Sequence, residues 1–276
     1  KYNDHIMNEV IERFLHEDLG IVDVTTDSIV PYDSTSEAVI IAKADGIIAG
    51  QVFACDVFRF LDEHIEYIEI KKDGDHVKSG EKITMIKGKT RAILTGERLA
   101  LNIMQRLSGI ASTTRAFVNA VAGTKARILD TRKTTPGLRL FERYAVRIGG
   151  GYNHRTNLSE MALIKENHIT TAGSIRNAVK KIKDSSNVPI EIEVKNMEEL
   201  KKAIEEQVDR IMLDNWTIDE IAKGVEFVRG RIPLEASGNM TLERVRDVAK
   251  TGVDFISVGF ITHSYKSLDL SLLLRE

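Results

Sequence analysis

From residue 125 onward, the sequence alternates short apolar runs with amphipathic segments at a nearly constant period. Polar or glycine residues close successive predicted strands at Glu193, Asp214, Ser237 and Gly259, which are 21, 23 and 22 residues apart. One strand-helix unit per twenty-odd residues is typical of α/β barrels, whose parallel strands are joined by right-handed crossovers. This repeat is the strongest constraint on the fold.

The apolar runs and capping signals define the individual elements of this repeat. Strands are predicted at 128–129, 162–164, 190–194, 210–213, 234–236 and 255–258. Helices are predicted near 138–149, 172–183, 196–206, 217–229 and 241–251. Thr217 with Glu220 forms a capping-box pattern, Asn196 and Thr241 are favourable N-caps, and Gly252 suits the position after a helix. These signals support six parallel strands.

A seventh strand within residues 149–155 is compatible with the pattern. A closed eight-stranded barrel needs more chain than remains, so we expect a short or open α/β barrel.

The first hundred residues have a different pattern. They predict helices at 3–18 and 52–61 and strands at 38–42, 47–49, 65–70 and 82–86. A long helix over 95–122, with a candidate break at Gly109, connects the two parts. The fold class is therefore α/β. An N-terminal α+β sandwich domain, residues 1–108, is followed by the barrel, residues 109–276, whose tail is free to return to the first domain.

Composition excludes several classes of protein. Lys plus Arg number 39 and Asp plus Glu 41, a net charge of −2, which excludes a globally basic nucleic-acid binder. No apolar run approaches the roughly 20 residues of a membrane-spanning helix, and residues 1–15 resemble an amphipathic helix rather than a secretion signal. Cys55, the single cysteine, is predicted to lie in the core and forms no intrachain disulfide, so we expect a cytoplasmic protein.

Polar residues gather where the predicted barrel strands end. In α/β barrels the functional groups lie at the carboxyl ends of the strands. The residues there are Asp130-Thr131-Arg132-Lys133, Lys165, Glu193, Asp214, Ser237-Gly238-Asn239 and Gly259. Any single one is compatible with an ordinary loop residue, but the full set on one rim predicts an active site.

Positive charge is concentrated in residues 130–165. Seven basic residues and three acidic residues lie there, a local charge of +4 in a chain of net −2. Arg139, Arg143 and Arg147 share a helix and are interpreted as a solvated face. Arginine binds carboxylate and phosphate through two points, and lysine acts as a point charge. The loop and strand-end residues are therefore the candidates for binding anions: Arg132, Lys133, Arg155 and Lys165.

Three glycine-containing turns are candidate phosphate sites. Gly149-Gly150-Gly151 precedes His154 and Arg155, Ser237-Gly238-Asn239 precedes a helix, and Gly259 precedes His263. A helix N-terminus presents unpaired N–H groups to an anion. One glycine alone is weak support, but turns after the last two strands match the usual phosphate site of α/β barrels.

Glu193 and Asp214 are unsuited to binding anions. They suit sugar hydroxyls, Mg²⁺, or a developing oxocarbenium charge in glycosyl transfer. The alternative is that they are ion-pair partners of Lys133 and Lys165. Lys165 is also a candidate Schiff-base nucleophile, which the neighbouring acids Glu166 and Glu193 disfavour.

His154 has three possible roles: metal ligand, donor to a carboxylate, or packed residue. No second histidine stands at ligand spacing, which disfavours a metal. His168 and Trp216 are interpreted as structural.

Longer motifs carry a resemblance to a known family. They are Glu97-Arg98-Leu99-Ala100-Leu101-Asn102, Leu107-Ser108-Gly109-Ile110-Ala111, Asp130-Thr131-Arg132-Lys133-Thr134-Thr135-Pro136-Gly137, Gly149-Gly150-Gly151-Tyr152-Asn153-His154-Arg155, Leu163-Ile164-Lys165-Glu166-Asn167-His168, Glu191-Ile192-Glu193-Val194, Met212-Leu213-Asp214-Asn215, Glu235-Ala236-Ser237-Gly238-Asn239 and Ser257-Val258-Gly259 with Thr262-His263-Ser264. Glu17-Asp18-Leu19-Gly20 with Asp23-Val24-Thr25-Thr26 also fits. On these motifs, which span nearly the whole chain, the sequence resembles the quinolinate phosphoribosyltransferases, a type II phosphoribosyltransferase family.

The resemblance implies a reaction and its components. Quinolinate and phosphoribosyl pyrophosphate would give nicotinate mononucleotide, CO₂ and pyrophosphate in NAD synthesis, with Mg²⁺ and without an organic cofactor. The enzyme would be a homodimer in which Arg98 reaches the neighbouring subunit's site, with no nucleic acid or membrane partner.

The resemblance also implies residue roles. Arg98, Arg132, His154, Arg155 and Lys165 would bind the two carboxylates. Lys133 and the Thr131 backbone would contact phosphoribosyl pyrophosphate, and Glu193 and Asp214 would hold the ribose hydroxyls and Mg²⁺. The 5′-phosphate would lie on Ser237-Gly238-Asn239 and Val258-Gly259-Phe260, near His263. The catalytic set would be Lys133, Lys165, Glu193 and Asp214.

Two positions depart from the family pattern. Asn157 and Glu160 stand where the family often has Gly and then Asp. Asparagine tolerates the left-handed conformation, so we expect the loop to survive. Three other functions remain as alternatives: a paralogue associated with molybdate transport, a Schiff-base aldolase using Lys165, and a non-catalytic binding module.

Overall fold

The computed structural model describes residues 4–275, and the expected start of the first helix at residue 3 lies outside them. The chain divides into two compact units. The first unit runs to Ser112 and includes the residues from Lys266 onward, and the second is Thr113–Tyr265. Within residues 4–275, none of the helices combines the length and apolarity needed to span a membrane.

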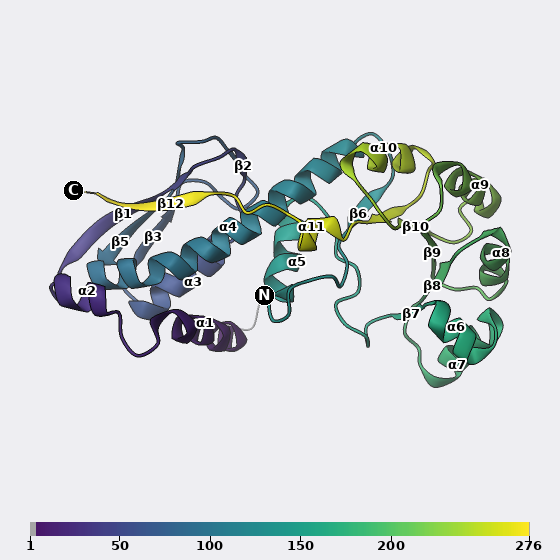
Figure 1. Ribbon diagram of the computed structural model, residues 1–276, viewed down its shortest axis with the longest axis horizontal. Coiled ribbons are helices and arrows are strands. Elements are labelled where there is room, and N and C mark those ends of the chain that lie inside the picture. Colours follow the sequence, from purple (N-terminus) through teal and green to yellow (C-terminus); the bar gives the residue numbers. More distant parts are fainter. Residues whose placement is uncertain (1–3, 276) are drawn as a thin grey trace. The chain divides into compact units, whose positions relative to one another are not determined.

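The first unit is built on a four-stranded antiparallel sheet in the order β12-β1-β5-β3. Its strands are β1 (Thr35–Ala42), β3 (Glu66–Glu69), β5 (Lys82–Lys89) and β12 (Leu270–Arg275), with a small ribbon of β2 (Gly46–Ile47) and β4 (His76–Val77). The helices are α1 (Asp4–Leu19), α2 (Val24–Ile29), α3 (Gln51–Leu61) and, up to Ser112, α4 (Thr90–Ala120), whose last residues belong to the second unit. The last strand, β12, was absent from the sequence prediction and pairs along β1 (Figure 1).

The core of this unit follows from the side-chain spacing. α3 buries Phe53, Ala54, Val57 and Phe58, which recur at the helical period and share one face. The candidate break of the long helix at Gly109 was wrong, because α4 is continuous. A Cβ at Gly109 would lie 2.3 Å from the backbone oxygen of Lys266. Glycine is therefore required there by the close passage of the C-terminal segment, and the helix is not interrupted.

The second unit contains a six-stranded parallel sheet in the order β6-β11-β10-β9-β8-β7. Its strands are β6 (Arg127–Leu129), β7 (Ala162–Ile164), β8 (Ile190–Val194), β9 (Arg210–Asp214), β10 (Leu234–Ser237) and β11 (Phe255–Ser257). The seventh strand considered for residues 149–155 is reduced to a single bridge between Leu129 and Tyr152. The expected short or open α/β barrel is therefore confirmed.

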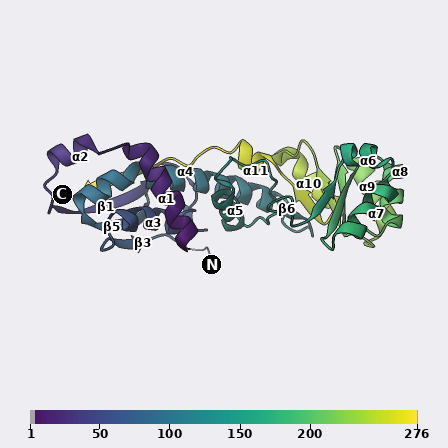
Figure 2. The same ribbon diagram turned by 90° about the horizontal axis from the view of Figure 1, so that it is seen from below.

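The helices of the second unit follow the strands in sequence, with α8 and α9 on the outer side of β8 and β9 (Figures 1 and 2). They are α5 (Arg139–Ile148), α6 (Glu166–Ala172), α7 (Ile175–Ser185), α8 (Met197–Glu205), α9 (Ile218–Val228), α10 (Leu242–Lys250) and α11 (Phe260–His263). The helix expected over 172–183 is α7, which begins at Ile175 because the Ser174 side chain caps it. The helix α6 before it was not predicted, and it ends at Gly173, which has φ +85°.

The predicted caps of this unit are confirmed. Thr217 and Glu220 form a capping box, and the side chains of Asn196 and Thr241 accept backbone N–H groups at the starts of α8 and α10. Gly252 follows α10 at φ +91°. Each of these N-caps fixes where its helix begins, and therefore where the loop that follows the preceding strand ends.

Candidate active site

The carboxyl ends of the barrel strands surround a cavity of about 570 Å³. Thirteen of the residues singled out in the sequence line it: Thr131, Arg132, Lys133, His154, Arg155, Lys165, Glu193, Asp214, Ser237, Gly238, Asn239, Gly259 and Phe260. Arg98 belongs to the first unit, Val258 is fully buried, and His263 lies on α11 without lining the cavity. The positive residues and the acid pair thus meet in one hollow.

Six further residues line the cavity although the sequence analysis assigned them no role in the site: Leu163, Met212, Asn215, Glu235, Met240 and Ser257. Four of them stand two positions before a strand-end residue that was singled out, as Glu235 stands before Ser237. Residues at i and i+2 of a strand point to the same face. Strand alternation was therefore the signal that would have found this second layer of cavity-lining side chains.

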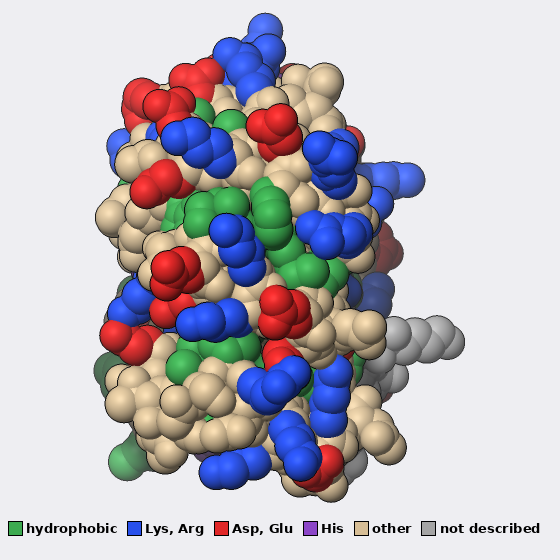
Figure 3. Space-filling model, turned by 90° about the vertical axis from the view of Figure 1, so that its right-hand side faces the viewer, with side chains coloured by type: hydrophobic (Ala, Val, Ile, Leu, Met, Phe, Trp, Pro, Cys, Tyr) green, Lys and Arg blue, Asp and Glu red, His purple; other side chains and the backbone are tan. Residues whose placement is uncertain are grey.

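The outer face over α6–α9 has no comparable concentration of one charge. In Figure 3, lysine and arginine side chains are interspersed with acidic ones, and apolar patches lie between them. Four of the seven basic residues of the segment 130–165 line the cavity instead: Arg132, Lys133, Arg155 and Lys165. Burial and the nearby charge of Arg132 lower the pKa of Arg155, so two guanidinium groups stand close enough to repel each other. An anion between them would relieve that repulsion.

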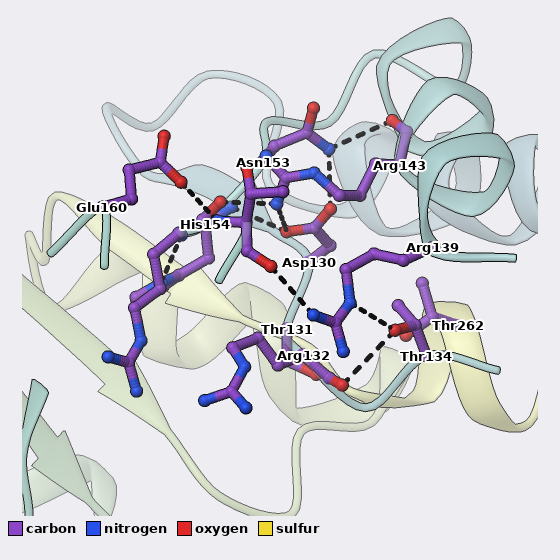
Figure 4. A network of polar contacts seen from close by, with 12 residues as sticks. Asp130, Thr131, Arg132, Thr134, Arg139, Arg143, Asn153, His154, Glu160 and Thr262 are labelled. Atoms are coloured by element: carbon purple, nitrogen blue, oxygen red, sulfur yellow. Dashed lines mark hydrogen bonds and ion pairs between the residues drawn. The ribbon is translucent and has the colours of Figure 1, made fainter. Parts of the chain in front are cut away.

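Arg139 and Arg143 do not form the solvated face that the sequence suggested. Arg139 donates from Nε to Thr134 Oγ1 at 2.9 Å and from Nη1 to the Thr156 oxygen at 2.9 Å. Arg143 donates from Nη1 to the His154 oxygen at 2.6 Å. Both helical arginines therefore tie the loops that carry the cavity's basic residues (Figure 4). Arg147, on the same helix, is exposed.

Asp130, directly after β6, connects the loop that carries Arg132 and Lys133 with the loop that carries His154 and Arg155. Its carboxylate is fully buried and accepts the backbone N–H of His154 and the side-chain amide of Asn153, both at 2.6 Å (Figure 4). Arg143 lies 3.7 Å away. Burial raises the pKa of Asp130, and these hydrogen bonds with the Arg143 charge oppose that rise. The segment after β6 and the segment around His154 are thereby held together.

His154 faces two buried carboxylates. Its Nε2 lies 2.9 Å from Glu191 Oε2 and 3.3 Å from Glu235 Oε2, and Arg210 Nη1 lies 3.0 Å from the same Glu235 oxygen. Burial alone would lower the pKa of His154, but the two carboxylates raise it to about 9. The backbone N–H of Arg155 lies 2.7 Å from Nδ1 and donates to it whenever the ring carries a single proton, on Nε2.

The sequence disfavoured a metal at His154 because no second histidine was near. The structure does bring three potential ligand atoms, from His154, Glu191 and Glu235, within 4.8 Å of one another. The donor at Nδ1 directs the ring proton to Nε2, which then donates toward the acids instead of offering a lone pair. Because the raised pKa of His154 favours the charged ring and Arg210 supplies a second cation, we interpret this cluster as an ion network.

Two turns at the ends of β9 and β10 lock together. Gly238 has φ +99°, and a Cβ there would lie 2.1 Å from Asn215 Oδ1. The Asn215 backbone N–H donates to the Ser237 oxygen at 3.0 Å. Arg244 of α10 donates to the Gly238 oxygen at 3.0 Å and to the Trp216 oxygen at 2.6 Å. The turn predicted to bind phosphate is therefore rigid and admits only glycine at its centre.

Gly259 provides a close approach for Lys133. A Cβ at Gly259 would lie 3.1 Å from Lys133 Cδ and 3.0 Å from His263 Nε2. The lysine stem thus passes over the glycine, beside the histidine of α11. Both residues belong to the set for which the sequence predicted contact with a phosphorylated sugar.

The acid pair and Lys165 meet at the cavity. Lys165 Nζ lies 3.4 Å from Glu193 Oε2, and Asp214 Oδ2 accepts the Asn215 amide at 2.8 Å. The ion-pair alternative for Glu193 is therefore realised with Lys165, inside the same cavity. The Lys165 side chain is 53% exposed, which is not the buried environment of a Schiff-base lysine.

Asn157 and Glu160, which depart from the family pattern, stabilise their loop in a way that was not expected. Asn157 is not in the left-handed conformation. Instead, its side-chain oxygen accepts the backbone N–H groups of Ser159 at 3.0 Å and Glu160 at 3.2 Å, and Glu160 accepts that of Thr156. The short polar side chain therefore closes the turn by hydrogen bonding.

The remaining single residues have structural roles. His168 accepts the Lys165 backbone N–H at Nδ1, and buried Trp216 donates to the Val194 oxygen at 3.0 Å, as expected. Cys55 is half-buried on α3 and not in the core as predicted, and this burial raises the pKa of its thiol.

An open α/β barrel with a basic, glycine-lined cavity facing two carboxylates defines an enzyme site for polyanionic substrates. Comparison with known proteins makes this specific. Residues 23–108 match the family model for the N-terminal domain of quinolinate phosphoribosyl transferase, and residues 110–273 match the model for its C-terminal domain. The chain therefore belongs to the quinolinate phosphoribosyltransferase family.

Relatives and solved structures agree with this membership. The chain is 45% identical, over 96% of its length and 92% of the relative's, to a probable nicotinate-nucleotide pyrophosphorylase (carboxylating) of Bacillus subtilis. It superposes with TM-score 0.95 on the nicotinate-nucleotide pyrophosphorylase of Francisella tularensis, at 42% identity, covering 100% and 98% of the two chains. NadC from Streptococcus pyogenes gives TM-score 0.95 at 37% identity, with coverage of 100% and 99%.

Proposed function

We propose that this chain transfers the phosphoribosyl group of phosphoribosyl pyrophosphate to quinolinate, releasing pyrophosphate and CO₂ and giving nicotinate mononucleotide. The observation that carries the proposal is the meeting of Arg132, Arg155 and Lys165 with Glu193 and Asp214 in one cavity. Both substrates are polyanions, so a positive rim is needed to overcome their mutual repulsion. Family membership makes quinolinate the acceptor.

The acid pair serves the sugar in this mechanism. Glu193 and Asp214 bind the ribose hydroxyls, and as C1 becomes oxocarbenium-like their negative charges stabilise it. They also fit Mg²⁺, since their hard carboxylate oxygens share the cavity with the proposed phosphate turns. Mg²⁺, when bound, supplies charge screening for the departing pyrophosphate. The 5′-phosphate lies on the Gly238 and Gly259 turns.

The basic residues serve the pyridine. Arg132, Arg155 and Lys165 hold the two carboxylates so that the ring nitrogen faces C1. The nitrogen's lone pair forms the new C–N bond as the C1–O bond to pyrophosphate breaks. The ring is then cationic, so the adjacent carboxylate leaves as CO₂ and its bonding electron pair stays on the ring carbon. That carbon takes up a proton.

A second copy of the chain is proposed to complete the site. Arg98 lies on α4 in the first unit and is exposed. The same unit exposes apolar side chains at and around α2, among them Val24 at 68%, Ile29 at 75% and Tyr32 at 74%. Exposed apolar groups of this kind favour self-association. We propose a homodimer in which Arg98 binds a quinolinate carboxylate in the partner's site.

Mixing inactive variants tests the shared site. Arg98→Ala dimers and Lys133→Ala dimers should each be inactive. Mixed dimers should regain about half of the wild-type activity, because one of their two sites holds intact residues from both chains, and a random equimolar mixture should regain about a quarter. Confirmed mixed dimers without activity would contradict the sharing of Arg98 but not the reaction.

The reaction itself is tested by quinolinate-dependent release of pyrophosphate and CO₂. Turnover should require Mg²⁺. It should be lost when a chelator removes the metal and should return when Mg²⁺ is added back. Nicotinate in place of quinolinate is the matched control, because it lacks the carboxylate that leaves. Folded protein that gives no turnover, or equal turnover with nicotinate, would contradict the proposal.

A reducing cytoplasm is the proposed compartment. It is supported by the single cysteine, which forms no intrachain disulfide.

A further inference from the structure

Beneath the cavity lies a buried group of charges that the mechanism above does not use. Glu191 and Glu235 are fully buried in β8 and β10, and both face Nε2 of His154. Within residues 4–275, neither oxygen of Glu191 has a hydrogen-bond partner of normal geometry, and neither does Glu235 Oε1. Two buried carboxylates without hydrogen-bond donors need positive charges beside them.

In the described part of the chain, two groups that can carry positive charge contact this pair. Arg210 Nη1 lies 3.0 Å from Glu235 Oε2 and compensates one carboxylate. The remaining candidate in contact with the pair is His154, which is 5% exposed at its side chain and 2.9 Å from Glu191. A doubly protonated imidazole at this position makes the cluster neutral, with two negative and two positive groups.

The Nδ1 edge of the His154 ring suggests a binding site for an anion. In the singly protonated ring, Nδ1 accepts the backbone N–H of Arg155 at 2.7 Å. A second proton on Nδ1 replaces that bond with two adjacent N–H donors, from the ring and from the Arg155 backbone. Adjacent donors of this kind form an anion site. Both residues line the cavity.

We propose that Glu191 and Glu235 are positioning residues that hold His154 in its doubly protonated form, so that Nδ1 and the Arg155 backbone N–H together bind one carboxylate of the substrate. This inference rests on the proposed function and deepens it. The proton and the carboxylate then favour each other's binding, because the anion separates two donors that otherwise repel.

Other charged groups also face the histidine and affect its protonation. Asp130, after β6, accepts the His154 backbone N–H, and Glu160 in the following loop interacts with the ring's charge; both favour the protonated ring. Arg143 of α5 and the side chains of Arg132 and Arg155 disfavour it. Burial raises the pKa of Glu191, and Glu235 adds to that rise. The pKa of His154 is raised to about 9 in this environment.

Calorimetry of quinolinate binding to the wild-type protein tests the linkage directly. Binding heats in two buffers of different ionisation enthalpy give the protons taken up per site. We expect almost none at about pH 7, where the ring already holds both protons, and about half a proton at about pH 9. Binding without proton uptake at the higher pH would overturn the inference. Absence of quinolinate binding at both would instead contradict the proposed function.

Variants assign the effect to the named residues. Glu191→Gln keeps the shape but removes the charge, so the alkaline limb of kcat/KM for quinolinate should move from about pH 9 to below about pH 8. KM for quinolinate at the higher pH should rise about tenfold, with KM for phosphoribosyl pyrophosphate nearly unchanged. The exposed Glu205→Gln on α8 is the matched control and should leave the profile in place.

Two further variants separate positioning from folding. Glu235→Gln should move the alkaline limb of kcat/KM for quinolinate in the same direction. This variant replaces Glu191→Gln in the test if the latter does not fold. His154→Asn should abolish proton uptake while the cavity's lysines remain, which excludes those lysines as its source. A uniform loss of kcat with the alkaline limb unmoved would indicate a merely structural acid pair and would overturn the inference.

Discussion

Thr262 Oγ1 donates a 2.8 Å hydrogen bond to the backbone oxygen of Lys133, across 129 positions of sequence. The bond is possible because β6 and β11 are neighbours in the sheet. The loop that follows β6 and carries Lys133 therefore lies against α11, which follows β11. Thr262 is 1% exposed, so the bond is shielded from water. It fixes the backbone from which the Lys133 side chain crosses Gly259.

Thr262→Val removes this hydroxyl and leaves a buried carbonyl without its partner. Such a loss costs about 1–2 kcal/mol. We expect kcat/KM for phosphoribosyl pyrophosphate to fall about tenfold, while KM for quinolinate changes little. Thr251→Val at the far end of α10 is the matched control, because its hydroxyl also bonds a carbonyl. Equal losses for both substrates in steady-state kinetics would contradict a local effect on Lys133.

Gly238→Ala should be far more damaging than its backbone conformation alone requires. Gly238 and Gly230 both have positive φ, +99° and +72°. A Cβ at Gly230 meets nothing within 4 Å, whereas one at Gly238 would lie 2.1 Å from Asn215 Oδ1. Gly230→Ala therefore measures backbone strain of about 1 kcal/mol, and Gly238→Ala adds displacement of the turn.

The expected readout is activity together with stability. Gly230→Ala should keep wild-type kinetics, and Gly238→Ala should lose at least about 100-fold in kcat/KM for phosphoribosyl pyrophosphate. Similar kinetics for the two variants would show that the Gly238 turn does not shape the phosphate site.

The raised pKa of His154 makes stability depend on pH. Below its ordinary value of 6.5 the ring is protonated in both folded and unfolded chains, and the stabilisation is complete. As pH rises, the unfolded ring loses its proton first, while the folded ring keeps it until about pH 9. Stability should therefore fall by about 3 kcal/mol between those values.

Urea unfolding followed by Trp216 fluorescence measures this fall, because the only tryptophan is buried in the second unit. His154→Asn should flatten the decline. The exposed His168→Asn is the control and should retain it. A wild-type protein equally stable across that range would contradict the charge assignment.

The positions of the cavity residues were predictable because the rule that locates them is local. A strand's end is marked by its apolar run and the following cap, and parallel strands bring their ends to one rim. Lys165, Glu193 and Asp214 could be placed in this way without knowing which strands are neighbours.

The supporting contacts were not predictable, because they depend on register between segments distant in sequence. In the sequence, nothing distinguishes Glu191 from the rest of the 41 acidic residues, and only the fold brings β8 and the His154 loop together so that Glu191 reaches Nε2. Arg139 and Arg143 have the spacing of a solvated helical face, and only the fold gives them carbonyl partners. Gly109 looks like a helix break until Lys266 passes beside it.

Arg244 provides the last prediction, because it bridges two loops with one planar group. Its Nη1 and Nη2 donate to the oxygens of Gly238 and Trp216 at 3.0 and 2.6 Å. Lysine keeps the charge but lacks the two-pronged geometry. Arg244→Lys should therefore raise KM for phosphoribosyl pyrophosphate about five- to tenfold while KM for quinolinate stays near its wild-type value.

A control for Arg244 lies on the same helix. Arg246 is exposed and donates to the Ala120 oxygen at 3.0 Å, outside the set of residues that line the cavity. Arg246→Lys makes the same chemical change and should leave both KM values unaltered. If Arg244→Lys were equally silent, the hydrogen bonds among Asn215, Ser237 and Asn239 would be sufficient to hold the two turns, and the guanidinium bridge would be redundant.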